Sequence, residues 1–110
     1  TLDATVVSAP EAFAMVTAEA AAALDASDRL GTLEPGKLAD MILLDLGRIH
    51  AVPLFDPLTH LVYSASKSDV RHVFVGGVQV VRDGALTRLD IDETLDEVRA
   101  LTPRIKASIA

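Results

Sequence analysis

The pattern of apolar and polar positions first becomes regular near residue 8. Ser8, Pro10 and Glu11 form an arrangement typical of a helix start, in which the serine caps the helix and the acid pairs back with it. One helix is therefore predicted from this point to about Leu24. The run from Ala20 to Ala23 has too little bulk to fill a core, but its small side chains allow another backbone to approach closely. The predicted apolar face consists of Phe13, Val16, Ala20, Ala23 and Leu24.

The middle of the chain alternates loops with short apolar runs. Residues 25–37 contain two glycines and a proline, and they predict a loop with a turn. The run from Ala39 to Asp45 is short, apolar and bounded by acids, which predicts a strand buried on both faces. Residues 46–57 are irregular in pattern, and residues 58–65 predict a short helix.

The clearest local pattern lies at residues 70–82. Two runs rich in β-branched residues, 70–75 and 78–82, are separated by Gly76 and Gly77. Glycine adopts a positive φ without steric cost, so this sequence predicts a β-hairpin with a two-residue turn. Asp83 and Gly84 indicate the next turn.

The last segment again shows apolar residues at spacings of three and four. Asp90 and Glu93 resemble a capping pair, and they precede a predicted amphipathic helix over residues 91–110. Pro103 lies inside this segment and is expected to kink or break the helix. The apolar face consists of Ile91, Leu95, Val98, Leu101, Ile105 and Ile109.

Composition restricts the class of protein. A chain of 110 residues forms one domain or less, and its formal net charge of −6 with scattered basic residues argues against a nucleic-acid partner. There is no cysteine and no run of 18 apolar residues, so we expect no disulfide framework, no membrane partner and a cytoplasmic location.

Two short motifs suggest chemistry but do not hold under inspection. Residues 31–37 match the first seven positions of a phosphate-binding loop, but Leu38 stands where a hydroxyl must bind magnesium, and Pro35 removes a backbone donor. A plain turn is the better interpretation. Residues 64–67 match the S-x-x-K pattern of serine acylases without its companion motifs, so a polar loop is expected there.

The three histidines do not form a metal-binding pattern. His50, His60 and His72 are far apart in sequence, and none stands in H-x-H or H-E-x-x-H spacing. His60 is interpreted as a hydrogen-bonded structural residue, and His72 as a satisfied, partly buried residue of a strand. We therefore assign no catalytic, cofactor-binding or metal-binding residue to this chain.

The order of several motifs nevertheless resembles the end of an amidohydrolase-superfamily chain. Residues 15–21 are followed by a G-x-L-x-x-G-K-x-A-D segment at 31–40, and then by Asp56-Pro57 and residues 60–65. The match continues to Gly84 and extends overall from about residue 10 to 105. It is similar to the branch containing methylthioadenosine/S-adenosylhomocysteine deaminases and triazine chlorohydrolases. Ala20 and Ala22 depart from the residues usual in that family.

This resemblance implies a (β/α)8 barrel with a divalent metal, zinc or iron, that converts bound water into a nucleophile. The hydroxide attacks an aromatic carbon that carries an amino or chloro group. The family's metal ligands and proton-transfer residues come from strands upstream of this segment, so none is carried over. Asp3 lies just before the last barrel helix and lacks the surrounding motif of the family's metal-binding aspartate.

The sequence thus predicts an α+β fragment. Residues 1–29 are assigned to the last barrel helix and its connection, 30–90 to strands of a small β-sandwich-like domain with the hairpin at 70–82, and 91–110 to a C-terminal helix. Its expected role is structural, within a hydrolase of C–N or C–Cl bonds, and the chain alone is expected to be inactive. The expected partners are the remaining barrel and a second copy contacted through residues 10–24. The alternative is a self-standing, non-catalytic α+β module for oligomerisation or binding.

Overall fold

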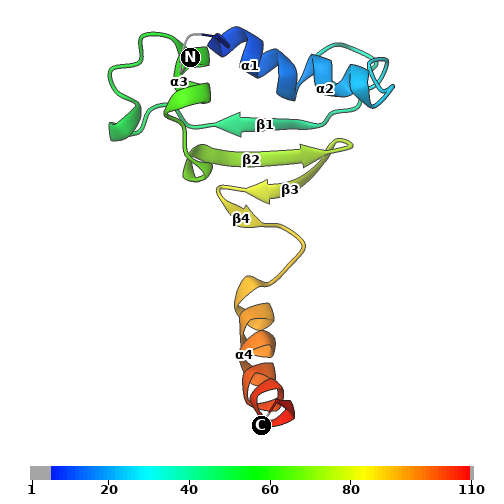
Figure 1. Ribbon diagram of the computed structural model, residues 1–110, viewed down its shortest axis with the longest axis vertical. Helices are drawn as coiled ribbons and strands as arrows, with labels where there is room; N and C mark the ends of the chain where they lie inside the picture. Colours follow the sequence, from blue (N-terminus) through cyan, green and yellow to red (C-terminus); the bar gives the residue numbers. More distant parts are fainter. Residues whose placement is uncertain (1–5, 110) are drawn as a thin grey trace.

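An antiparallel sheet forms the centre of the computed structural model, which describes residues 6–109 (Figure 1). The strand order is the same as the order in sequence, so each strand pairs with its neighbour along the chain. The strands are β1 (Met41–Leu44), β2 (Val70–Val75), β3 (Val78–Arg82) and β4 (Ala85–Leu86).

The predicted hairpin is confirmed as β2 and β3. Gly76 and Gly77 connect them with φ values of +55° and +77°, and Val75 lies opposite Val78. Two positive φ values in a two-residue loop give a turn whose twist matches that of the strands. The turn is also tied to the residues before β1, because the Gly76 amide donates to the Asp40 carboxylate at 2.5 Å.

The predicted strand around residues 39–45 is confirmed as β1, but the expectation that it is buried on both faces is wrong for the described residues. Ile42 is 52% exposed and Leu43 is 45% exposed. Within residues 6–109, β1 is an edge strand paired only with β2, and the helices make no extensive contact with the sheet. An apolar run therefore predicted the strand correctly but not what covers it.

The predicted N-terminal helix is divided into α1 (Ala9–Val16) and α2 (Ala18–Ala23). The expected cap is present: the Glu11 amide donates to Ser8 Oγ, and the Ser8 amide donates to Glu11 Oε2 at 2.8 Å. The division occurs at Thr17, whose φ and ψ are −123° and −94°. Its hydroxyl donates to the Phe13 carbonyl at 2.7 Å, a side-chain bond of the kind that bends helices.

The loop after α2 packs closely against it. A Cβ added to Gly31 would lie 2.7 Å from the Ala21 Cβ and 3.0 Å from the Ala18 Cα. The expectation that the alanine run admits a close backbone is therefore confirmed, and the approaching backbone belongs to this chain.

A short helix, α3 (Pro57–Tyr63), packs against α1. It agrees with the predicted helix at 58–65 to within two residues. Asp56 caps it, since its carboxylate accepts the Thr59 amide at 2.8 Å. Two single turns of 3₁₀ helix, η1 (Ile49–Ala51) and η2 (Lys67–Asp69), lie on either side of α3 in sequence.

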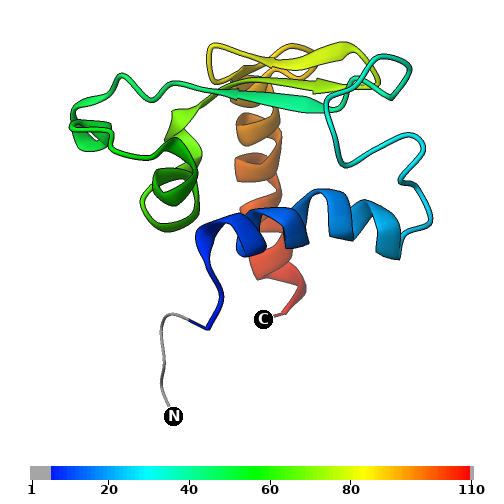
Figure 2. The ribbon, with the colours of Figure 1, turned by 90° about the horizontal axis from the view of Figure 1, so that it is seen from above.

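The C-terminal helix, α4 (Ile91–Ser108), extends away from the sheet (Figure 1). Figure 2 shows it on the same side of the sheet as α1 and α2. It continues through Pro103, so the predicted break does not occur. The proline leaves one carbonyl in the preceding turn without its donor, and water can satisfy that carbonyl on an exposed helix.

Few side chains of the chain are buried. The buried apolar residues among those described are all alanines, namely Ala9, Ala21, Ala26 and Ala51. No helix within residues 6–109 is long and apolar enough to cross a membrane.

We expect Gly77→Val to lower the free energy of unfolding by about 1 kcal/mol or more, because valine is strained at positive φ. Asparagine tolerates that region, so Gly77→Asn should cost less. Denaturant titration measures both. Equal stability of the valine variant and the parent would contradict this turn.

Gly31→Ala should destabilise the chain more than Gly36→Ala, by about 1–3 kcal/mol. The two glycines share a φ near +90°, but no atom lies within 4 Å of a Cβ at Gly36. The backbone cost should be similar in the two variants, so the difference between their stabilities reports the clash with Ala21. Adding Ala21→Gly to Gly31→Ala should recover part of the loss; equal losses at both glycines would argue against this contact.

Candidate functional site

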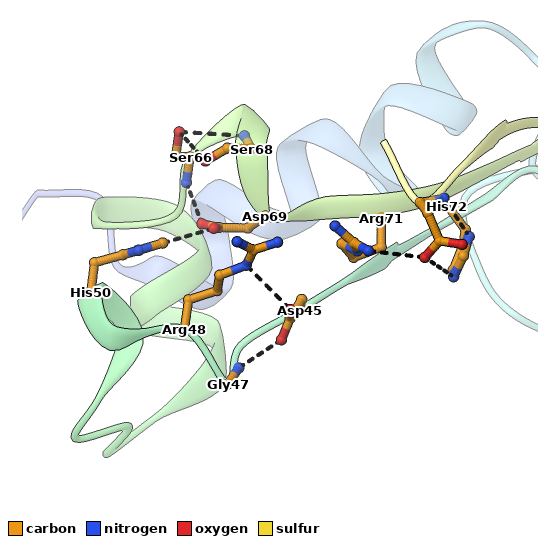
Figure 3. A network of polar contacts seen from close by, with 10 residues as sticks. Asp45, Gly47, Arg48, His50, Ser66, Ser68, Asp69, Arg71 and His72 are labelled. Atoms are coloured by element: carbon orange, nitrogen blue, oxygen red, sulfur yellow. Dashed lines mark hydrogen bonds and ion pairs between the residues drawn. The ribbon is translucent and has the colours of Figure 1, made fainter. Parts of the chain in front are cut away.

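The most completely buried polar side chain is Asp69, with an exposure of 0%. It lies in η2, immediately before β2. One carboxylate oxygen accepts the Ser66 amide at 2.8 Å, and the other lies 2.7 Å from Nε2 of His50 (Figure 3). The Asp69 carbonyl accepts the Asp45 amide at 2.7 Å. Asp69 therefore connects η1, the residue after β1 and the start of β2.

The hydrogen bonds keep Asp69 ionised. The Ser66 amide does most to hold the pKa of the Asp69 carboxyl below its ordinary value. Burial opposes this effect, and the hydrogen bond and charge of His50, with the more distant charge of His60, lower the pKa further. Asp69 has no accessible surface, but the combined effect of its hydrogen bonds on the pKa outweighs the effect of desolvation.

The pairing of His50 with Asp69 resembles the base and orienting acid of a hydrolytic triad. A triad also needs a nucleophile that hydrogen-bonds the imidazole. Among the described residues, no hydroxyl hydrogen-bonds His50, and the nearby Ser66 hydroxyl instead accepts from Ser68. The pair is therefore suited to holding η1 in place, and no catalytic role follows from it.

The interpretation of His60 needs correction. Its Nε2 is buried and has no hydrogen-bond partner among residues 6–109, so the expectation of a hydrogen-bonded histidine is wrong for this atom. His60 borders an open depression of about 240 Å³. The residues near His60 in sequence did not predict the missing partner. Whether a buried polar atom forms a hydrogen bond depends on contacts with residues distant in sequence. The other residues of the depression are Pro53, Leu54, Phe55, Asp56, Thr59 and Ser64.

His72 has the satisfied, partly buried environment that was expected. Its Nδ1 lies 3.1 Å from Nε2 of Gln79 and accepts the Asp83 amide at 3.3 Å. These contacts hold the turn after β3 against β2. Arg71 adds an ion pair to Asp83 at 2.9 Å.

The two short motifs have structural roles. Lys37, the lysine of the loop at 31–37, forms an ion pair with Glu34 at 3.2 Å, and the segment leads into β1 instead of a helix. Ser64 ends α3, and Ser66 and Asp69 form a capping box around η2. The first segment is a turn and the second is a polar loop, as the sequence predicted.

The described residues do not provide a metal centre. Between residues 6 and 109, no three side chains of His, Asp or Glu converge at a distance that could hold an ion. Both oxygens of Asp69 are already engaged by Ser66 and His50. Asp3 lies outside the described residues. That the chain lacks metal and catalytic residues stays a prediction.

Comparison with known proteins places this geometry in context. Residues 2–80 match the model of the amidohydrolase family. The chain is 42% identical over 106 residues to a 5-methylthioadenosine/S-adenosylhomocysteine deaminase of Syntrophobacter fumaroxidans, covering 96% of this chain and 24% of that protein. It is 38% identical over 82 residues to a 5'-deoxyadenosine deaminase of Methanopyrus kandleri, covering 74% of this chain and 19% of that protein.

Solved structures agree with these sequence matches. An adenosine deaminase from Xanthomonas campestris with bound zinc aligns with a TM-score of 0.86 and 30% identity, over 96% of this chain and 24% of that one. An atrazine chlorohydrolase from Arthrobacter aurescens TC1, complexed with zinc, aligns with a TM-score of 0.76 and 28% identity, over 86% and 21%. The chain thus spans about a quarter of the length of these proteins.

Stability should depend on pH through Asp69. Because its pKa is lowered on folding, its ionised form stabilises the fold above the unfolded value of about 3.9, and this contribution is lost as the pH falls through the folded pKa. The variant Asp69→Asn should therefore have a lower free energy of unfolding than the parent at pH 7, and the difference between the two should be smaller at pH 3. Denaturant titration at both pH values measures this.

The matched control is Asp28→Asn, since Asp28 is exposed and, within the described part of the chain, forms an ion pair only with its neighbour Arg29. The free energy of unfolding of this control should differ little from that of the parent at either pH. A deficit for Asp69→Asn that is the same at pH 7 and pH 3 would contradict the role given to the carboxylate.

Proposed function

Because this chain belongs to the amidohydrolase family, we propose that it is the C-terminal structural part of a metal-dependent hydrolase that removes the amino group of adenosine-type nucleosides. The deaminase relatives support this substrate class, since the alignment with the Syntrophobacter protein covers nearly the whole chain. The chlorohydrolase extends the reaction type to loss of chloride from a heterocycle.

The main support for a structural role is the large amount of surface that the chain leaves uncovered. Its radius of gyration is 19.2 Å, whereas a compact domain of this length has about 13 Å. Its accessible surface is 8642 Å², against roughly 5800 Å² for a compact protein of this mass. A chain with a core of alanines and this excess of surface is suited to packing against more protein.

The uncovered surface includes one face of the sheet. The register places Ile42 beside Val73, and Val73 beside Val81. Val75 and Leu86 extend this face to the hairpin turn and to β4, and both are exposed. An apolar sheet face is stabilised when a second sheet packs on it. We propose that this face belongs to a two-layer β domain completed by another part of the protein.

The N-terminal helices present a second uncovered surface. Met15, Val16 and Leu24 are exposed, although α3 and the loop at Gly31 cover other parts of α1 and α2. We propose that α1 and α2 together are the last helix of the barrel, interrupted at Thr17. The remaining barrel would then cover these side chains.

The chemistry of such an enzyme is hydrolytic displacement of ammonia, with a divalent metal activating water. The relatives that carry zinc support zinc in the complete protein, and iron is the other metal that the sequence resemblance implied. The described donors do not fit this metal, so we derive no step of the reaction from them. We propose that this chain contributes by holding η1 in place against the sheet through Asp69.

We expect the chelator-washed 110-residue chain to hold no stoichiometric metal and to release no ammonia from 5'-methylthioadenosine or S-adenosylhomocysteine. A longer polypeptide that includes the upstream barrel should hold about one metal ion per chain and be active. Elemental analysis and an ammonia assay measure both. One tightly bound zinc or iron ion per 110-residue chain would overturn the assignment.

Hydrogen exchange separates the structural role from a self-standing module. If other protein covers the sheet, amides of β1 should exchange faster in the 110-residue chain than in the longer polypeptide. Equal protection in the two proteins would favour the self-standing oligomerisation or binding module.

A further inference from the structure

The helix α4 has no cover within the described part of the chain. None of its residues is buried, and it makes no extensive contact with the sheet or with the other helices. It also extends away from both (Figure 1). By contrast, α1 packs on α3. The association expected from the sequence, through residues 10–24, stays a prediction, but α4 is the less covered surface.

Five apolar residues of the last segment, together with the polar Thr102, follow the repeat of a coiled coil. The spacing of four, three, four, three and four residues is that of adjoining core positions in a heptad. The side chains are exposed; Val98 is 56% and Ile105 is 57% exposed. The stripe consists of Ile91, Leu95, Val98, Thr102, Ile105 and Ile109, and Leu101 of the predicted apolar face lies next to it.

The charges along α4 favour one partner for this stripe and one relative direction of the two helices. The first half of α4 is acidic, with Asp92, Glu93, Asp96 and Glu97. The second half is basic, with Arg104 and Lys106, and Arg99 lies at the middle of the helix. An antiparallel second copy of the same helix places each acidic half beside a basic half, whereas a parallel copy places like charges together.

We propose that α4 is a dimerisation helix that binds α4 of a second copy of this chain in antiparallel orientation. A two-fold axis near residue 100 pairs Leu95 with Ile105 of the second copy, and Val98 with Thr102. Asp92 then lies beside Lys106 of the second copy, twice by symmetry. Arg99 meets its own counterpart near the axis, and its ion pair with Asp96, at 2.8 Å within the same helix, offsets this repulsion.

The proposed interface is small. A helix of 18 residues is about 27 Å long at a rise of 1.5 Å per residue, so its single seam buries less than a standard protein interface. The dimer is therefore expected to depend on concentration. Its formation does not depend on whether the parent protein is a deaminase, and its test does not use activity.

The test reverses charge beside the stripe. Asp92→Lys, or Lys106→Asp, turns two attractive contacts into repulsive ones and should raise the dimer dissociation constant by about tenfold in sedimentation equilibrium. The double variant Asp92→Lys/Lys106→Asp should restore most of the parent affinity. Glu93→Lys is the matched control: it makes the same charge change in the same turn but lies away from the seam, so it should change affinity less.

A cysteine cross-link reports the orientation. The chain has no cysteine, so Leu101→Cys introduces a unique thiol beside the proposed axis, and oxidation should link two copies. A mixture of Asp92→Cys and Lys106→Cys chains should form mainly the mixed disulfide. Preferential linkage of Asp92→Cys to itself would indicate parallel helices and overturn the proposal.

Two further results would also overturn it. One is a monomer at all concentrations in both the 110-residue chain and a longer polypeptide that contains it. The other is a longer polypeptide in which α4 is protected from hydrogen exchange while the protein is monomeric, because α4 would then be covered by its own chain. Failure of the double variant to restore dimerisation would refute the pairing of Asp92 with Lys106.

Discussion

The hydrogen bonds of Asp69 connect η1 and η2 to the end of the paired strands β1 and β2. Its carboxylate fixes His50 and the amide of Ser66, and its carbonyl accepts the amide of Asp45. A chain whose buried apolar residues are alanines gains little from burial there, since alanine offers a small apolar area. The position of η1 relative to the sheet therefore depends on a buried charge whose partners are all supplied by the chain itself.

The same shortage of core explains why the chain is best understood as a part of a larger protein. Its sheet and helices each have an apolar face that its own elements leave exposed, and hydrophobic burial is the main favourable term in folding. These faces are not alike. The N-terminal helices and the sheet present apolar surfaces that the proposed barrel and second sheet would cover, whereas α4 presents a stripe along one side with acidic residues toward its start and basic residues toward its end, as the proposed helix pair requires. One short chain can in this way carry surfaces for two different kinds of contact.

Local sequence determined much of the secondary structure. The capping residues Ser8 and Asp90 begin their helices as predicted, and Gly76 and Gly77 form the expected turn, because each effect acts over a few residues and needs no distant partner. The family resemblance also came from local motifs. The interruption at Thr17 was not predicted, because the residue pattern around it favours a continuous helix and does not show whether the Thr17 hydroxyl bonds to the Phe13 carbonyl. The close contact of Gly31 with the same region comes from a loop, so it was not visible in the helix pattern either.

Burial and hydrogen-bond satisfaction were decided only by the tertiary structure. The apolar run of β1 indicated a strand, but its place at the sheet edge leaves Ile42 and Leu43 exposed, and no residue pattern shows which strand lies at an edge. The spacing of the histidines predicted that they form no metal cluster, but the pairing of His50 with Asp69 could not be foreseen, nor could the lack of a partner for His60 Nε2 among the described residues. The sequence determined which elements form, because propensity and capping are local; only the packing of distant segments decided which side chains lose water and which polar atoms find partners.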